Sequence, residues 1–200
     1  MYRAMAWYML DLGVDVADPQ AVAAALSAEP RLESTTDPDG PTIAVDGRDV
    51  SEPIRGEAVT GAVSPVAAVP EVRERLVALQ REAVAQAQAA GRGIVVEGRD
   101  IGTVVLPDAT AKIFLTADAD ARAARRALED AGRMGERAPA AGDIAATAAS
   151  LAQRDAIDSG RAVAPLRRAD GAVQVDGTYL TLDEVIATIV GIVQKASESR

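Results

Sequence analysis

The sequence of 200 residues predicts an α/β fold, a parallel-sheet core flanked by helices. Two short apolar runs, at 93–96 and 111–115, are typical of buried strands because turn residues bound them on both sides. Long helical patterns precede the first run and follow the second, an alternation that favours parallel strands. The first run leads into Glu97-Gly98-Arg99-Asp100. Charged groups are therefore expected at the carboxyl end of a strand, where open parallel sheets bind their ligands.

The N-terminal part of the sequence predicts two helices and a hairpin. The expected elements are helices at 1–12 and 19–26 and hairpin strands at 42–45 and 48–50. Gly13 is a stop signal for the first helix, and Asp18 is a cap for the second. Asp46-Gly47 supplies the positive φ angles that a two-residue hairpin turn requires.

Apolar periodicity and its breaks predict the remaining elements. These are a short helix within 51–62, a long helix from Pro70 to about Ala90, helices at 116–130 and 143–157, a strand at 173–176 and a terminal helix at 181–196. Ser64-Pro65 indicates a break, since proline inside a helix removes a hydrogen bond. Thr181 is expected to cap the last helix. The stretch 132–142 contains Gly, Ala and Pro and is expected to be flexible.

Composition limits the chemistry that the chain can perform. The sequence contains no His and no Cys, which excludes a Ser-His-Asp triad, a thiol nucleophile, a disulfide framework and most zinc sites. The remaining carboxylate, guanidinium, hydroxyl and backbone groups suit phosphate handling, where catalysis is mainly positioning and charge neutralisation. All but two of the 21 basic residues are Arg. The planar Arg fork binds phosphate, although a general preference for Arg codons explains the count equally well.

Charge and hydropathy exclude two classes of partner. The net charge of -9 argues against general nucleic-acid binding, which needs a basic surface. No apolar run approaches the ~20 residues of a membrane span, and the N-terminus lacks a basic region followed by a long apolar core. The expected location is therefore the cytoplasm, without nucleic-acid or membrane partners.

Several motifs occur in a fixed order along nearly the whole chain. They are Met1–Ala4, Ser64–Ala68, Pro70–Arg73, Gln80-Arg81, Glu97–Val105, Pro107–Ala109, Arg154-Asp155 and Asp158–Leu166. Together they resemble the bacterial cytidylate kinases, members of the P-loop nucleoside monophosphate (NMP) kinase group. The resemblance implies an NMP-kinase core at 1–27 and 62–200, a small β-containing NMP-binding insert at 28–61 and a lid region at 122–160 within the core. It also implies a monomer that phosphorylates CMP and dCMP to CDP and dCDP with ATP and Mg²⁺.

The resemblance assigns a role to each matching residue. Asp100 and Ser64 resemble the residues that read cytosine in this family. The Asp100 role makes chemical sense, because a carboxylate can accept a hydrogen bond from the exocyclic amine that uracil lacks. Arg73 resembles the residue that donates to the cytosine carbonyl edge. The other implied roles are the monophosphate cradle for Tyr2, Arg3 and Arg99, the ribose contacts for Arg154 and Asp158, and catalysis for Arg161 and for the lid arginines Arg122, Arg125 and Arg126.

Plainer roles compete with these. Asp100 could cap a helix, Ser64 could be an N-cap before Pro65, Tyr2 and Arg3 could belong to a frayed terminus, Asp158 and Arg161 could form a surface ion pair, and the lid arginines could be solvated charges. Two other functions also stay open. One is a non-catalytic cytidine-nucleotide-binding or interaction protein derived from the kinase. The other is a kinase for UMP or AMP, against which Asp100, Arg73 and Ser64 argue.

The sequence departs from the family at the phosphate-binding loop. That loop reads Gly-x-x-x-x-Gly-Lys-Ser/Thr, whereas no glycine of this sequence is followed by Lys. Met1-Tyr2-Arg3 matches a motif downstream of the loop, so a strand-loop-helix unit of roughly 30 residues is expected to be absent. In the family this loop holds the donor phosphates and helps to hold Mg²⁺. We therefore expect the 200-residue polypeptide to have little or no kinase activity and to be unstable or prone to aggregation.

Overall fold

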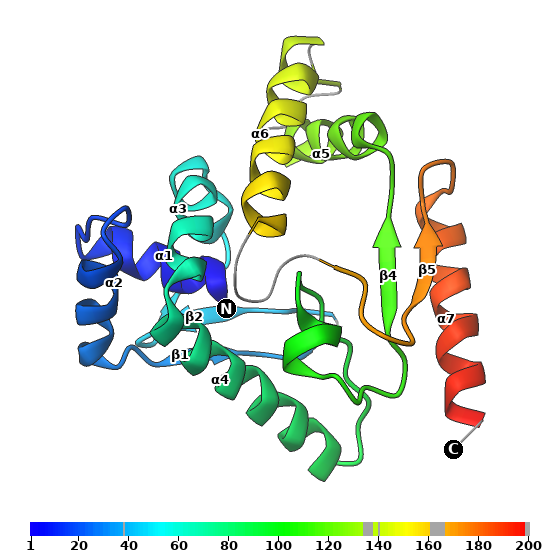
Figure 1. Ribbon diagram of the computed structural model, residues 1–200, viewed down its shortest axis with the longest axis horizontal. Coiled ribbons are helices and arrows are strands. Elements are labelled where there is room, and N and C mark those ends of the chain that lie inside the picture. Colours follow the sequence, from blue (N-terminus) through cyan, green and yellow to red (C-terminus); the bar gives the residue numbers. More distant parts are fainter. Residues whose placement is uncertain (38, 134–137, 140, 161–166, 199–200) are drawn as a thin grey trace. The chain divides into compact units, whose positions relative to one another are not determined.

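The computed structural model describes residues 1–200 except 38, 134–137, 140, 161–166 and 199–200. The chain forms two compact units, Met1–Val96 and Glu97–Arg200 (Figure 1). The predicted α/β class with a parallel sheet is confirmed, since helices occur in both units and a parallel strand pair lies in the second. None of the described helices has the length and apolar character that crossing a membrane would require.

Helices form most of the first unit. They are α1 (Tyr2–Asp11), α2 (Pro19–Ala25), α3 (Glu57–Ala68) and α4 (Pro70–Ala89), with the 3₁₀ turns η1 (Leu26–Ala28) and η2 (Pro53–Arg55). The Asp18 carboxylate accepts a hydrogen bond from the backbone N–H of Gln20 at 2.9 Å and so caps α2. The helices predicted at 1–12, 19–26 and 70–90 are confirmed to within about two residues.

One apolar cluster holds the helices of the first unit together. Met5 and Met9 of α1 are fully buried and belong to the same cluster as Val66 of α3 and Leu76 of α4. Met5 and Met9 are one helical turn apart and therefore share a face of α1. Truncation of a fully buried Leu such as Leu76 to Ala costs about 2–5 kcal/mol in proteins generally. The N-terminal helix is therefore an integral part of this core.

The break predicted at Ser64-Pro65 is wrong. Helix α3 continues through Pro65 to Ala68 and ends at Val69, whose extended backbone precedes Pro70. Pro65 removes one backbone donor. However, Val63 and Val66 are buried on either side of it, so the packing of this turn offsets the lost bond. The true boundary follows from Pro70, because a residue before proline avoids the helical conformation.

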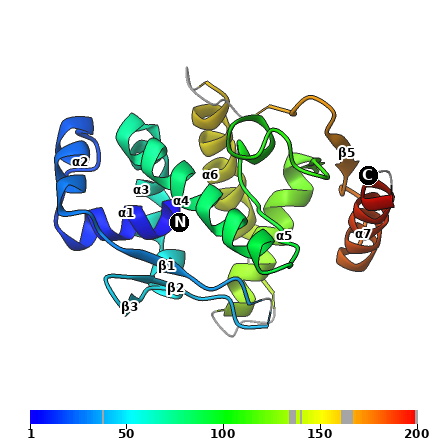
Figure 2. The ribbon, with the colours of Figure 1, turned by 90° about the horizontal axis from the view of Figure 1, so that it is seen from below.

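The first unit also contains an antiparallel sheet with strand order β1-β2-β3, seen side by side in Figure 2. The strands are β1 (Leu32–Ser34), β2 (Ile43–Val45) and β3 (Arg48–Asp49). Asp46 and Gly47 have φ angles of 50° and 77°, as the predicted hairpin turn requires. These strands fall within the range 28–61, and the assignment of that range as an NMP-binding insert stays a prediction.

The second unit combines a parallel strand pair with three long helices among its described residues. Its elements are the π-helical turn η3 (Ile101–Val105), β4 (Ile113–Thr116), α5 (Ala119–Arg133), α6 (Ala141–Ser159), β5 (Val173–Asp176) and α7 (Leu182–Glu198). β4 and β5 run parallel and side by side, with Ile113 opposite Val173 and Thr116 opposite Asp176 (Figure 1). Part of the stretch 132–142, which is expected to be flexible, lies outside the described residues.

Helix α7 begins at the predicted cap. The Glu184 carboxylate accepts hydrogen bonds from the backbone N–H and the hydroxyl of Thr181 at 2.8 and 2.9 Å. In return, the Glu184 N–H donates to the Thr181 hydroxyl oxygen at 3.3 Å. This reciprocal arrangement is a capping box and satisfies two backbone donors at the helix start.

The strand predicted at 93–96 is wrong. The backbone of these residues pairs with no strand among the described residues, and Val95 is 94% exposed. A strand is stable only when its backbone donors and acceptors pair with a neighbour. An apolar run therefore indicates the capacity to form a strand, while the pairing depends on a partner that the run itself does not specify.

Candidate active site

Two of the predicted cytosine-reading residues are buried in the first unit. Ser64 lies on α3 and is 5% exposed, and Arg73 lies on α4 and is 8% exposed. Burial of a polar or charged side chain is costly unless it is hydrogen-bonded, and both residues have interaction partners. Ser64 lies in the middle of α3, so its alternative role as an N-cap is wrong.

Tyr2 and Arg3 are ordered parts of α1. Tyr2 packs against the apolar cluster of the first unit. The Arg3 guanidinium donates from Nε to the carbonyl oxygen of Ile54 at 2.5 Å and from Nη2 to Oγ1 of Thr60 at 2.7 Å. Arg3 thus joins α1 to η2 and α3. These contacts exclude a frayed terminus, while the monophosphate role of both residues stays a prediction.

In the second unit, Asp100 is buried at the start of η3. It is 6% exposed, and its side chain makes no capping hydrogen bond to this turn. Its backbone carbonyl accepts from the N–H of Val104 at 2.9 Å and from Oγ1 of Thr103 at 3.2 Å. The carboxylate therefore does not act as a helix cap. π-helical turns are rare and occur frequently at functional sites.

Arg99 and Arg122 share one carboxylate. Arg99 donates from Nη1 to Oδ1 of Asp155 at 2.9 Å, and Arg122 donates from Nη1 to Oδ2 of the same residue. The Asp155 side chain is 21% exposed. The three residues come from the segment before η3, from α5 and from α6, so this ion-pair group brings together residues that are distant in the sequence.

The pKa of Asp155 reports the strength of this arrangement. Burial by itself would raise the pKa of the carboxyl group, but the hydrogen bond from Arg122 and the charges of Arg99 and Arg122 outweigh it. The pKa of Asp155 consequently lies below its usual value. The carboxylate is charged at neutral pH and stays paired with both guanidinium groups.

The other two lid arginines have different surroundings. Arg125 donates from Nη2 to the carbonyl oxygens of Gly177 at 2.5 Å and Leu180 at 2.9 Å, and so holds the loop between β5 and α7. Arg126 pairs with Glu129 and Asp130 on its own helix. The lid role of both arginines stays a prediction.

The sequence comparisons identify the family. A family described as "Cytidylate kinase" matches residues 1–195. The chain belongs to the cytidylate kinase family. It is accordingly a nucleoside monophosphate kinase, a transferase, by family. These comparisons give no support to the alternative of a non-catalytic protein derived from the kinase.

Curated relatives agree with this assignment over almost the whole chain. The chain is 54% identical to a cytidylate kinase of Streptomyces griseus over 193 residues, which are 96% of this chain and 78% of the relative. It is 52% identical to a cytidylate kinase of Nocardia farcinica, with 96% and 79% of the two chains covered. Identity to a cytidylate kinase of Geobacillus thermodenitrificans is 46%, with 98% and 82% covered.

Three residues with family-implied roles are not fully described. Arg161 lies outside the described residues, and Arg154 and Asp158 belong to α6 but their side chains lie outside the described part. Their catalytic and ribose-binding roles stay predictions. Their neighbour Asp155 was not assigned a role from the sequence, although it is part of the Arg154-Asp155 motif. Only its pairing with Arg99, 56 positions away, reveals its place in the site.

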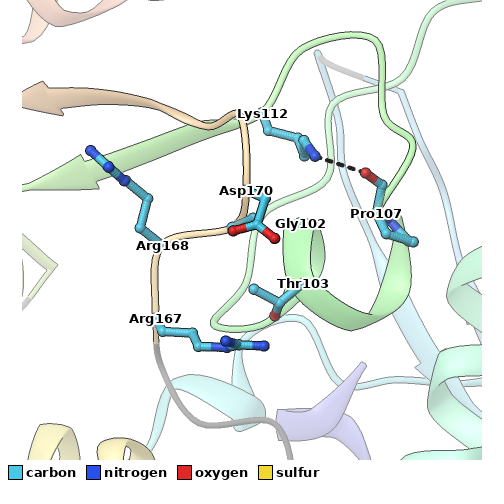
Figure 3. A pocket seen from close by; sticks show the side chains of 8 residues that line it. Gly102, Thr103, Pro107, Lys112, Arg167, Arg168 and Asp170 are labelled. Atoms are coloured by element: carbon cyan, nitrogen blue, oxygen red, sulfur yellow. Dashed lines mark hydrogen bonds between the residues drawn. The ribbon is translucent and has the colours of Figure 1, made fainter.

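A pocket of the second unit is lined by residues that received no site role from the sequence (Figure 3). It is lined by Gly102, Thr103, Pro107, Lys112, Arg167, Arg168, Ala169 and Asp170. Lys112 donates from Nζ to the carbonyl oxygen of Pro107 at 2.8 Å, and Arg167 extends toward Thr103. Lys112 and Asp170 precede β4 and β5. The pocket therefore lies at the amino ends of these strands, whereas open parallel sheets bind ligands at the carboxyl ends.

Proposed function

We propose that the reaction of this family member is the transfer of a phosphoryl group from ATP to CMP and dCMP, yielding CDP and dCDP, and that the residues of this chain supply its acceptor site. One observation carries this proposal. The described residues contain three buried polar or charged side chains, and these are Ser64, Arg73 and Asp100. They are the same three residues that the sequence predicts to read cytosine. Burial and sequence motif therefore select the same set independently.

The chemistry of the three side chains fits cytosine better than uracil. A carboxylate can only accept hydrogen bonds when it is ionised, so Asp100 suits the exocyclic amine of cytosine. Arg73 can only donate, which suits the cytosine carbonyl. With UMP, the Asp100 carboxylate would face a carbonyl oxygen, and two acceptors that face each other form no hydrogen bond, so UMP should bind less tightly than CMP.

Several hydrogen-bond donors, one tyrosine hydroxyl and otherwise arginines, would bind the phosphate of the acceptor. We assign this role to Tyr2, Arg3 and Arg99, with Arg161 and the lid arginines Arg122, Arg125 and Arg126 acting on the transferring group and Arg154 and Asp158 binding the ribose. The shared pairing of Arg99 and Arg122 with Asp155 supports a role for these two, because it places two guanidinium groups together. Arg125 and Arg126 have less support, since protein groups already accept from both.

The donor side of the reaction rests on the family, which generally uses ATP and Mg²⁺. The sequence contains no Gly-x-x-x-x-Gly-Lys-Ser/Thr loop, and the described residues contain no group of three acidic side chains that could hold a metal ion. The described residues thus do not fit the Mg²⁺ site or the cradle of the donor phosphates. A monomeric state and a cytoplasmic location also stay predictions, which sedimentation and cell fractionation can check.

Competition binding tests the proposed acceptor. We expect the chain to bind CMP and dCMP at least about tenfold more tightly than UMP or AMP, the discrimination of one well-placed base contact. Asp100→Asn should remove the preference for CMP over UMP, because an amide can donate to the uracil carbonyl. Asp108→Asn, on an exposed turn nearby, is the matched control and should leave it unchanged. Equal affinity of the unmodified chain for CMP and UMP would refute the proposal.

A further inference from the structure

The Asp155 carboxylate lies between two guanidinium groups and pairs with both. Each of its oxygens accepts from a different arginine, Oδ1 from Arg99 and Oδ2 from Arg122. Two cations held close together repel each other, and a carboxylate between them offsets that repulsion. The three groups keep a net charge of +1, so the arrangement still attracts an anion.

Arg122 retains a donor for a ligand. A guanidinium group has five N–H donors, and the contact with Asp155 uses Nη1 of Arg122. Its Nε is buried, and no hydrogen-bond acceptor for it is found in the part of the chain that the structure describes. Since buried donors are nearly always paired in folded proteins, this one calls for an explanation. A ligand oxygen would satisfy it.

Phosphate is the ligand that fits the pair. Its oxygens accept several hydrogen bonds at once, and arginine binds it through a rigid planar fork. The arginines come from the segment before η3 and from α5, while Asp155, which pairs with both, lies on α6. Two long side chains that rotate independently lose conformational entropy when they bind phosphate. A carboxylate that pairs with both orders them before the ligand arrives, so less entropy is lost on binding.

We propose that Asp155 is a positioning residue that holds Arg99 and Arg122 together as a clamp for the phosphate of the acceptor nucleotide, a role that Arg122 has in addition to acting on the transferring group. The proposal rests on the function proposed above and extends it to a residue without an assigned role. Asp155 itself does not touch the nucleotide. A plain structural ion pair would have the same contacts, so the test must separate phosphate binding from general stability.

The decisive comparison is between CMP and cytidine, which differ only in the phosphate. Titration calorimetry on the 200-residue chain should show that Asp155→Asn weakens CMP binding by about tenfold, the effect of one charge-assisted hydrogen bond. The affinity for cytidine should stay unchanged. Asp11→Asn is the matched control, because it breaks an Asp–Arg ion pair with Arg48 in the first unit. It should change neither affinity.

Pyrophosphate provides a second probe that does not depend on base recognition. If the unmodified chain fails to prefer CMP over UMP, the proposed function fails, while weaker pyrophosphate binding by Asp155→Asn would still support the clamp. Equal losses for CMP and cytidine, or no loss for CMP and pyrophosphate, would overturn it.

A measurement on the unmodified chain covers the case in which the variant does not fold. In ¹⁵N-arginine NMR spectra, the Arg122 Nε–H resonance should shift on addition of CMP and stay in place with cytidine. An equal response to both compounds would overturn the clamp.

Discussion

Arg125 of α5 lies with its Nη2 group 2.5 Å from the carbonyl oxygen of Gly177, 52 positions further along the chain. The same nitrogen lies 2.9 Å from the carbonyl oxygen of Leu180. One side chain therefore holds the loop at the carboxyl end of β5 against the helix that follows β4. This contact makes Arg125 a structural residue, whatever further role it has toward a nucleotide.

Arg125→Gln should lower the melting temperature of the chain. Hydrogen bonds that involve a charged group contribute about 1.5–3 kcal/mol each, and Gln is too short to reach both carbonyl oxygens. Differential scanning calorimetry measures the change. Arg126→Gln is the control, because Arg126 pairs with Glu129 and Asp130 on its own helix, and such pairs are worth about 0.3–0.5 kcal/mol. Equal shifts for both variants would contradict the structural role of Arg125.

The ion pairs of Asp155 should make stability depend on pH. Since pairing lowers the pKa of this carboxyl group in the folded chain, its contribution is complete above the usual pKa of about 3.8. It is lost as the pH falls through the lower, folded value. We expect the free energy of unfolding, measured with urea, to fall more steeply below about pH 4 in the unmodified chain than in Asp155→Asn. Parallel pH profiles would count against this pairing.

Local signals explain which parts of the fold were predictable. The cap at Asp18, the turn at Asp46-Gly47 and the capping box at Thr181 depend on residues within a few positions of one another, and the structure confirms all three. Their chemistry is complete in the local sequence. The roles of Ser64 and Arg73, by contrast, are predicted by motifs that the family shares and not by local structure.

Long-range relationships explain the errors and the omissions. Pro65 indicated a helix break, but burial of the adjacent valines keeps α3 intact. The run at 93–96 has strand character, yet strand pairing is a property of two segments. Asp155 belongs to the site through partners 33 and 56 positions away. No local pattern contains that information.

Two glycines should respond in opposite directions to substitution by Ala. Gly47 has a φ angle of 77° in the hairpin turn, a conformation that a residue with a Cβ atom adopts at a cost, so Gly47→Ala should destabilise the chain by about 1 kcal/mol. Gly61 lies inside α3, and the space that the Cβ atom of an alanine would occupy there is open. Gly61→Ala should stabilise the chain by about 1 kcal/mol, the difference in helix propensity. Thermal melts of the two variants check the signs, and a shared sign would contradict the assigned conformations.

An apolar stripe on α7 should cause the 200-residue chain, expected to be a monomer at low concentration, to self-associate at high concentration. Leu182, Ile186, Val190 and Val193 follow one another at helical spacing and are 74%, 49%, 47% and 40% exposed. Contiguous exposed apolar surface of this kind favours association, because contact removes it from water. Sedimentation velocity should therefore show larger species as the concentration rises. Ile186→Gln with Val190→Gln should shift the distribution toward the monomer, whereas Ala187→Gln, off the stripe, should not. A concentration-independent monomer in the unmodified chain would show that the stripe does not drive association.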